Sequence, residues 1–129
     1  MLRKEAEEEL LNLLDKIKEG QVIVEGKRDK KALCLLGFNN VLTINKGIYE
    51  TAEKTKDSVI VLTDYDSEGR KIAKKLNLVL QSLGRSVDRE TRRKIGLLFT
   101  KLEIRKIEEL RGVLNGKTSA INFKVHNLR

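Results

Sequence analysis

The sequence predicts an α/β fold in which helices cover both faces of a mostly parallel central sheet. Three short runs of consecutive apolar, largely β-branched residues alternate with segments of helical periodicity. Runs that are apolar on both faces are typical of the central strands of a parallel sheet. Alternating strands and helices favour right-handed crossovers and three layers. We therefore expect the order αβαβαβα.

The first helix is predicted by the spacing of its apolar side chains. They recur at intervals of three and four positions, at Leu10, Leu13, Leu14 and Ile17. Glutamates precede them and lysines lie near the end, which suits the helix dipole. Gly20 is a natural end for this helix.

Strands and helices then follow in alternation. The strands are expected at 22–24, 41–44 and 58–62. The helices are expected at 29–36, at about 49–56 and at about 68–83. Gly37 and Gly84 mark the ends of the first and the third of these helices.

The C-terminal part predicts two more helices, at 87–99 and 103–114. The second would present Ile107, Leu110 and Leu114 on one face. The last residues fit either an edge strand over 120–125 or a tail.

Length and composition indicate one domain. The 129 residues are 40% hydrophobic and 36% charged, enough apolar material for a core beneath a highly charged surface. No repeat or linker divides them. We expect a single domain over 1–129, with its core motifs in 21–84 and a helical C-terminal extension over 85–129.

Charge and cysteine content narrow the classes of function. Lysine and arginine number 27 against 19 acidic residues, and this surplus of +8 favours polyanionic partners such as RNA, DNA or nucleotides. Cys34 is the only cysteine, which excludes an internal disulfide and a multi-cysteine metal site. Its apolar neighbours predict that it is buried. No stretch is apolar enough for a signal peptide or a membrane span, so we expect a soluble, cytoplasmic protein. The only histidine, His126, lies away from the acidic clusters, which leaves a serine or cysteine triad without support.

Acidic residues follow two of the predicted strands. Glu25 comes directly after the first, and the run DYDSEG, residues 64–69, comes after the third. If these strands are parallel neighbours, Glu25, Asp64 and Asp66 meet at one edge of the sheet. Crowded carboxylates raise one another's pKa unless a positive charge lies among them, and oxygen ligands suit Mg²⁺ or Mn²⁺. Glu25 could instead serve as a general acid or base.

Two other interpretations of DYDSEG need no such site. Asp, Ser and Gly are ordinary turn residues, and an aspartate can simply cap the next helix. The spacing also copies the first half of a calcium-binding EF-hand loop. Lys75 stands where that loop requires a bidentate glutamate, and the preceding segment is strand-like, so we discard the EF-hand.

Two segments together resemble the signature motifs of the Toprim domain. They are VIVEGKRD, residues 22–29, followed by a helix, and VIVLTDYDSEGRKIA, residues 59–73. This domain is shared by type IA and type II topoisomerases, bacterial-type primases, OLD-family nucleases, RecR recombination proteins and the ribonuclease that matures 5S ribosomal RNA. The resemblance covers about 21–84 and implies a three-layer, Rossmann-like Toprim fold. The D-x-D-x-E-G pattern is most similar to type IA topoisomerases, whereas the size and the segment TINKG, residues 43–47, are more similar to the 5S maturation enzyme and to small stand-alone Toprim proteins.

The resemblance implies roles for the acidic residues. Asp64 and Asp66 match the metal-binding pair of the family. Glu25 matches a glutamate proposed there as a general acid/base or a metal ligand. Glu68 corresponds to the extra acidic residue of the topoisomerase pattern.

Two glycines, Gly26 and Gly69, match positions where the family's backbone turns tightly near the site. Topoisomerase and primase activities need further domains, which 129 residues have no room for. We therefore do not expect either activity from this chain alone.

Basic and aromatic residues lie beside the acidic clusters. Lys27 and Arg70 are the nearest and are the preferred phosphate contacts, with Lys71 next to them. Lys46 fits a phosphate-facing loop or, slightly better, a plain turn. Tyr65 fits equally a base-stacking platform and a ring packed against the next helix.

A later basic cluster comprises Arg89, Arg92, Arg93 and Lys94. It either extends a nucleic-acid track or is plain surface.

These observations favour a small Mg²⁺- or Mn²⁺-dependent nuclease that acts on RNA or DNA, in RNA processing or DNA repair. One metal with acid/base help from Glu25, or two metals, would both be consistent with these residues. The alternative is a non-catalytic module that binds nucleic acid or serves a larger processing complex. A receiver-like phosphoacceptor domain is a third and weaker hypothesis. The chain could act as a monomer or as a dimer.

Overall fold

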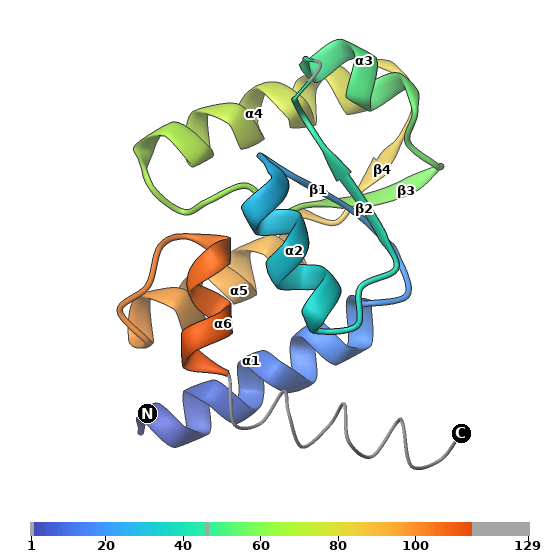
Figure 1. Cartoon of the computed structure of the whole chain (residues 1–129). Coiled ribbons are helices and arrows are strands. Elements are labelled where there is room, and N and C mark those ends of the chain that lie inside the picture. The colour runs from blue at the N-terminus through green and yellow to red at the C-terminus, as the bar shows by residue number, and fades with distance from the viewer. Residues whose placement is uncertain (1, 46, 115–129) are drawn as a thin grey trace, which may run out of the picture.

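Four parallel strands form the centre of the protein, in a computed structural model that describes residues 2–45 and 47–114 (Figure 1). Their order across the sheet is β2-β1-β3-β4. The strands are β1 (Gln21–Val24), β2 (Asn40–Thr43), β3 (Ser58–Val61) and β4 (Ser86–Val87). The helices are α1 (Arg3–Ile17), α2 (Lys27–Leu35), α3 (Ile48–Glu53), α4 (Ser67–Ser82), α5 (Arg89–Lys101), the 3₁₀ helix η1 (Ile107–Glu109) and α6 (Leu110–Val113).

The helices cover the sheet on both sides. Figure 1 shows α3 and α4 above the sheet and α1, α2, α5 and α6 below it. The alternation of side chains along β1 matches this arrangement, since Val22 and Val24 join the core on one face and Ile23 joins the core on the other. Every residue of β1 is buried, as its central place in the sheet requires. The predicted α/β fold with three layers is confirmed.

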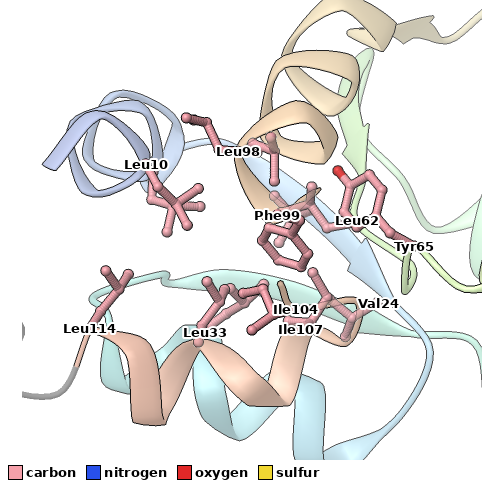
Figure 2. Packing of buried hydrophobic residues seen from close by; sticks show 14 of the residues in the cluster. Leu10, Val24, Leu33, Leu62, Tyr65, Leu98, Phe99, Ile104, Ile107 and Leu114 are labelled. Carbon is pink, nitrogen blue, oxygen red and sulfur yellow. The ribbon is translucent and has the colours of Figure 1, made fainter. Parts of the chain in front are cut away.

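The larger of the two cores lies below the sheet. Leucines from three helices lie there in one cluster with Phe99 of α5 (Figure 2). Leu10 comes from α1, Leu33 from α2 and Leu114 from the end of α6, and each is fully buried. Burial of one such side chain contributes about 1.5 to 3 kcal/mol. The helices outside the predicted 21–84 core are therefore part of what holds the sheet.

The smaller core lies between the sheet and the helices α3 and α4. Ile23 and Val61 of the two central strands pack there against Leu76 and Leu80 of α4. This packing fixes α4, which begins at Ser67 within the DYDSEG run, against the sheet.

The two central strands, β1 and β3, are where the chain changes direction across the sheet. They are neighbours, with Val22 beside Ile60 and Ile23 beside Val61. From β1 the chain crosses to β2 at one edge, and from β3 it crosses to β4 at the other. Ligands of open α/β sheets bind outside the carboxyl ends of the strands at such a point. Glu25 and Asp64 follow these two strands.

The start of α5 differs from the prediction of a helix over 87–99. Ser86 and Val87 instead pair in parallel with Ser58 and Val59 of β3. A strand of two residues has no periodicity that a sequence pattern can reveal. The helix begins at Arg89, after Asp88, whose side chain accepts a hydrogen bond from the backbone N–H of Thr91 at 3.0 Å.

The predicted helix over 103–114 is also corrected. Glu103 has a φ of 57°, so the chain reverses there instead of starting a helix. Helical structure begins only with η1 and continues into α6. Ile107, Leu110 and Leu114 are nevertheless all buried, as their spacing indicated.

The sulfur environment differs from expectation as well. Cys34 is exposed, because Ala32 and Leu33 occupy the buried side of α2 and the next position turns outward. The segment 117–129, for which we weighed a strand or a tail, lies outside the described residues. Within the described residues, no helix is long and apolar enough to cross a membrane.

Candidate functional site

The two acidic residues that follow β1 and β3 are in direct contact. The carboxylate of Glu25 accepts a hydrogen bond from the backbone N–H of Asp64, with 2.7 Å between Oε2 and N. Besides burial, the negative charge of Glu25 also raises the pKa of the Asp64 carboxyl group. The predicted meeting of these two residues at one edge of the sheet is what the topology produces, because β1 and β3 are parallel neighbours.

Asp64 is also held by the first residue of η1. Its Oδ1 accepts a hydrogen bond from the backbone N–H of Ile107 at 2.8 Å. The next residue, Tyr65, donates its own N–H to the carbonyl of Arg105 at 2.6 Å. The segment around 105–107 therefore clamps the loop after β3, and the acidic pair is held between rigid elements.

Burial disfavours the ionised form of Asp64. The pKa of Asp64 is raised from 3.8 to about 6, first by burial and then by the neighbouring carboxylates of Glu25 and Asp66, against the hydrogen bond from Ile107. Asp29, which is buried at the start of α2, has a pKa raised by burial and by the charge of Asp64. Such a group of carboxylates favours a proton or a cation among them.

The two remaining acidic candidates are placed differently. Asp66 is the N-cap of α4, and its Oδ1 accepts the backbone N–H of Gly69 at 2.7 Å. Glu68 is exposed on the first turn of α4. Asp66 therefore does have the capping role that we weighed against metal binding.

The donor set fits a hard cation that keeps most of its water. Among the described residues no three side chains of Asp, Glu, His or Cys are grouped as a ready metal site. Mg²⁺ commonly binds through only one or two carboxylates together with waters and substrate phosphates. The pair Glu25 and Asp64 meets that requirement, because a cation between the two would relieve their repulsion.

The two candidate glycines are not alike. A Cβ at Gly69 would lie 2.0 Å from the backbone oxygen of Asp64, so the approach of α4 to the loop leaves no room for a side chain. A Cβ at Gly26 would have no atom within 4 Å, and its φ of −149° is open to any residue. Crowding therefore requires glycine only at 69.

A cavity of about 550 Å³ opens over the acidic pair. Lys27 and Arg28 line it from the start of α2, together with Glu25 and Asp64. The preferred phosphate contact Lys27 thus lies on the cavity that contains the pair.

Sequence reasoning missed four other residues of this cavity, which are Asp29, Asn45, Lys106 and Glu108. Lys106 and Glu108 come from a segment that only the tertiary fold brings to the pair. Lys46, which follows Asn45, lies outside the described residues.

The other predicted cations line a second cavity, of about 760 Å³, on the far side of the loop 64–66. Arg70 and Lys71 line it, together with Asp66 and Arg105. The predicted phosphate contacts therefore fall into two groups, with Tyr65 and Asp66 on the side of the second cavity.

The ring of Tyr65 is packed in the core and is not exposed as a stacking surface. Only 9% of the residue is exposed, and its ring centre lies 4.8 Å from that of Phe99 (Figure 2). Its hydroxyl donates to the backbone carbonyl of Arg92 at 2.8 Å. Of the two interpretations of this residue, the geometry favours packing, although the ring packs against α5 and not against the next helix in the chain, α4.

Arg92 has a role that neither interpretation of the later basic cluster included. Its Nη1 donates to the carbonyls of Val61 and Thr63 at 3.1 and 2.8 Å, and its Nη2 donates to that of Asp64 at 3.2 Å. It thereby orders the backbone on which the acidic pair depends. The signal for it was its place three residues before Ile95 and seven before Phe99, on the buried side of α5.

Comparisons with known proteins place this geometry in context. The family model of the Toprim domain matches residues 21–98. A UPF0292 protein of Archaeoglobus fulgidus is 38% identical over 103 residues, which are 75% of this chain and 82% of that protein. A UPF0292 protein of Methanocaldococcus jannaschii is 35% identical over 125 residues, covering 89% of this chain and 97% of the relative. A solved structure of a protein from Aquifex aeolicus is similar with a TM-score of 0.65 and 34% identity, over 79% of this chain and 95% of that one.

Proposed function

Because the chain belongs to the Toprim family, we propose that it is a small metal-dependent nuclease that acts on RNA or DNA at the carboxyl ends of β1 and β3. The observation that carries this proposal is the contact between Glu25 and Asp64. It brings together the acidic residues that follow two neighbouring strands, at the point of the sheet where ligands of such folds bind.

A divalent cation, Mg²⁺ or Mn²⁺, would be held by Glu25 and Asp64, with Asp66 and Glu68 at the rim. When bound, it would polarise the phosphate and stabilise charge on the leaving oxygen. With one cation held mainly by Asp64, Glu25 is the residue that we assign to proton transfer, since it lines the cavity and its carboxylate is not tied into a helix cap.

The surrounding cations suit a phosphodiester substrate. Lys27, Arg28 and Lys106 line the same cavity as the acidic pair. Basic side chains in this position can hold the phosphates that neighbour the scissile one. The net charge of +8 would add long-range attraction for a nucleic acid.

One observation favours the alternative function, a non-catalytic module that binds nucleic acid. Asp66, one half of the expected metal pair, already accepts a hydrogen bond as the cap of α4. A protein that used these aspartates only to order its loop would keep the fold and the basic surface without cleavage.

The test is cleavage of end-labelled structured RNA, single-stranded DNA and duplex DNA in Mg²⁺, Mn²⁺ or EDTA. Wild type is compared with Glu25→Gln and with Asp64→Asn/Asp66→Asn. These variants keep the acceptor oxygens for the bonds from Asp64, Ile107 and Gly69, so they should fold.

A matched control is Glu53→Gln, which removes an exposed carboxylate on α3 that lines none of the cavities described above. Metal-dependent cleavage that both site variants lose and the control keeps supports the nuclease. Nucleic-acid binding without cleavage in any metal would assign the protein to the alternative.

A further inference from the structure

A third cavity, of about 360 Å³, lies between the start of α4 and α5, along which its lining runs from Arg89 to Thr100. Four arginines line it, Arg70 from α4 and Arg89, Arg92 and Arg93 from α5. None of the described residues that line it is acidic. We call it the arginine pocket.

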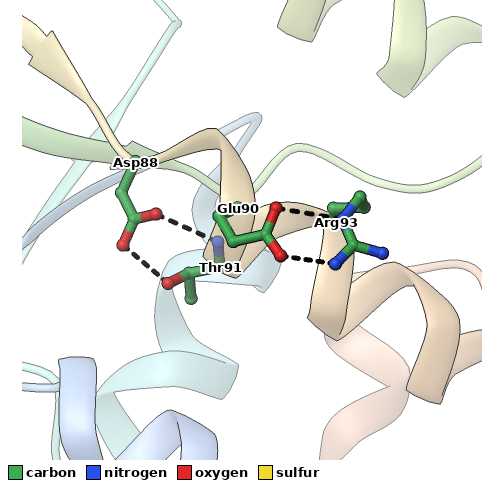
Figure 3. Close-up of polar contacts among 4 residues, drawn as sticks. All are labelled: Asp88, Glu90, Thr91 and Arg93. Carbon is green, nitrogen blue, oxygen red and sulfur yellow. Dashed lines mark hydrogen bonds and ion pairs between the residues drawn. The ribbon is translucent and has the colours of Figure 1, made fainter.

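The four guanidinium groups differ in what they already contact. Arg92 is committed to the carbonyls at the end of β3. Arg93 forms an ion pair with Glu90 one turn earlier, as Figure 3 shows. Arg70 and Arg89 have no ion pair within the described part of the chain, and both are exposed.

The start of α5 is fixed in place, so the arginines are presented from a rigid helix. Both carboxylate oxygens of Asp88 are used by Thr91, one for its N–H at 3.0 Å and one for its hydroxyl at 2.6 Å (Figure 3). Glu90 in turn orients the guanidinium of Arg93. These contacts reduce the entropy that Arg93 would otherwise lose when it contacts a ligand.

Cations gathered around one cavity repel each other unless an anion joins them. Arginine presents a planar fork of donors that matches phosphate oxygens, often through two bonds at once. The pocket therefore has the charge and the donors for a phosphate group. Leu97, which is 53% exposed at the same pocket, adds an apolar surface for the sugar or base attached to that phosphate.

The pocket is continuous with the rest of the site. It shares Tyr65, Arg70 and Thr100 with the cavity of about 760 Å³, which in turn borders the loop 64–66 beside the acidic pair. A strand that crosses this loop would leave the acidic pair on one side and reach the arginine pocket on the other.

We propose that the arginine pocket is a phosphate subsite, in which Arg70 and Arg89 bind a backbone phosphate of the nucleic-acid strand at some distance from the one at the acidic pair. This subsite rests on the proposed function only in that the same strand would be the substrate. Binding to the pocket itself needs neither metal nor cleavage.

The test measures binding of a short, labelled single-stranded oligonucleotide by fluorescence anisotropy in EDTA over a range of salt concentrations. The pocket pair Arg70→Gln/Arg89→Gln is compared with the control pair Lys75→Gln/Lys94→Gln. Both pairs remove one exposed cation from α4 and one from α5, but neither lysine of the control pair lines the pocket.

The pocket pair should bind about tenfold more weakly than the control pair, with the slope of log Kd against log salt lower by about one. Equal weakening in the two pairs would mean that the arginines act only through net charge and would overturn the subsite. A nucleoside monophosphate that binds as tightly as the oligonucleotide, and loses binding in the pocket pair, would assign the pocket to a free nucleotide and overturn the strand assignment. Because no metal is present, failure of the subsite is distinguishable from failure of the nuclease proposal, which is read from cleavage.

Discussion

The guanidinium of Arg92 lies 4.3 Å from the centre of the Tyr65 ring, and the hydroxyl of Tyr65 donates to the backbone carbonyl of Arg92. Arg92 of α5 and Tyr65 of the loop that carries Asp64 therefore contact each other in two ways. A cation over an aromatic face is stabilising when it is shielded from water, as it is here by the burial of the ring. This contact fixes the acidic loop to the helix behind it.

Replacement of Arg92 should lower the stability of the protein. Arg92→Met keeps much of the apolar stem but leaves three backbone carbonyls without their charged donor, and we expect a loss of roughly 2 to 4 kcal/mol in the free energy of unfolding. Urea denaturation followed by circular dichroism measures it. Arg93→Met on the same helix is the control, and the loss of its solvent-exposed pair with Glu90 should lower the free energy of unfolding much less. Equal losses would contradict the role of Arg92.

Substitution of Gly69 should destabilise the protein by displacing the loop that carries Asp64. The Cβ of Gly69→Ala would lie 2.0 Å from the backbone oxygen of Asp64, so either α4 or the loop must move. We expect a loss of about 3 kcal/mol or more in thermal or urea unfolding. Gly112→Ala in α6 has open space at its Cβ and should stabilise by up to about 1 kcal/mol. A Gly69→Ala protein as stable as wild type would show that the crowding is relieved at little cost.

The contact between Glu25 and Asp64 was predictable on the single condition that their two strands are parallel neighbours. Each residue follows an apolar run, and parallel neighbours bring their carboxyl ends to one edge. The role of Arg92 was not predictable in the same way, because it depends on where the carbonyls of the loop point. Its neighbours Arg89 and Arg93 have the same chemistry in the sequence and different contacts in the fold.

The elements that sequence reasoning misplaced are those held by tertiary contacts. β4 forms because Ser86 and Val87 pair with β3. Helical structure is interrupted at Glu103 because the chain turns back there toward Asp64. Local periodicity carries no information about either constraint. The same reversal brings Lys106 to the cavity of the acidic pair, which is why no motif revealed it.

The stability of the metal-free protein should fall as pH rises from about 4 to about 7. The pKa of Asp64 is about 6 in the folded protein and near 3.8 in the unfolded chain, so the folded state binds this proton more tightly. The favourable contribution is complete below about pH 4 and is lost as pH passes through 6. Urea unfolding in EDTA at several pH values measures the decline.

Asp64→Asn is the matched variant, because the amide oxygen can still accept the bond from Ile107 but cannot ionise. Its stability should change less over the same pH range. Removal of the Asp64 charge also removes one cause of the raised pKa of Asp29, which flattens the profile further. An equal decline in wild type and variant would show that other groups carry the pH dependence. Added Mg²⁺ at pH 7 should raise the free energy of unfolding of the wild-type protein, and it should raise that of the variant much less.

The cap and the metal roles of Asp66 can be separated by two substitutions. Asp66→Asn keeps an oxygen that accepts the N–H of Gly69, because asparagine is as good an N-cap as aspartate. Its stability in EDTA should lie within about 0.5 kcal/mol of wild type, whereas Asp66→Ala should lose about 1 kcal/mol. Mg²⁺ titration by calorimetry then tests the charge, which both variants lack. If Asp66 is a ligand, both variants should bind Mg²⁺ at least tenfold more weakly than wild type. Unchanged affinity in Asp66→Asn would show that Asp66 serves only as the N-cap of α4.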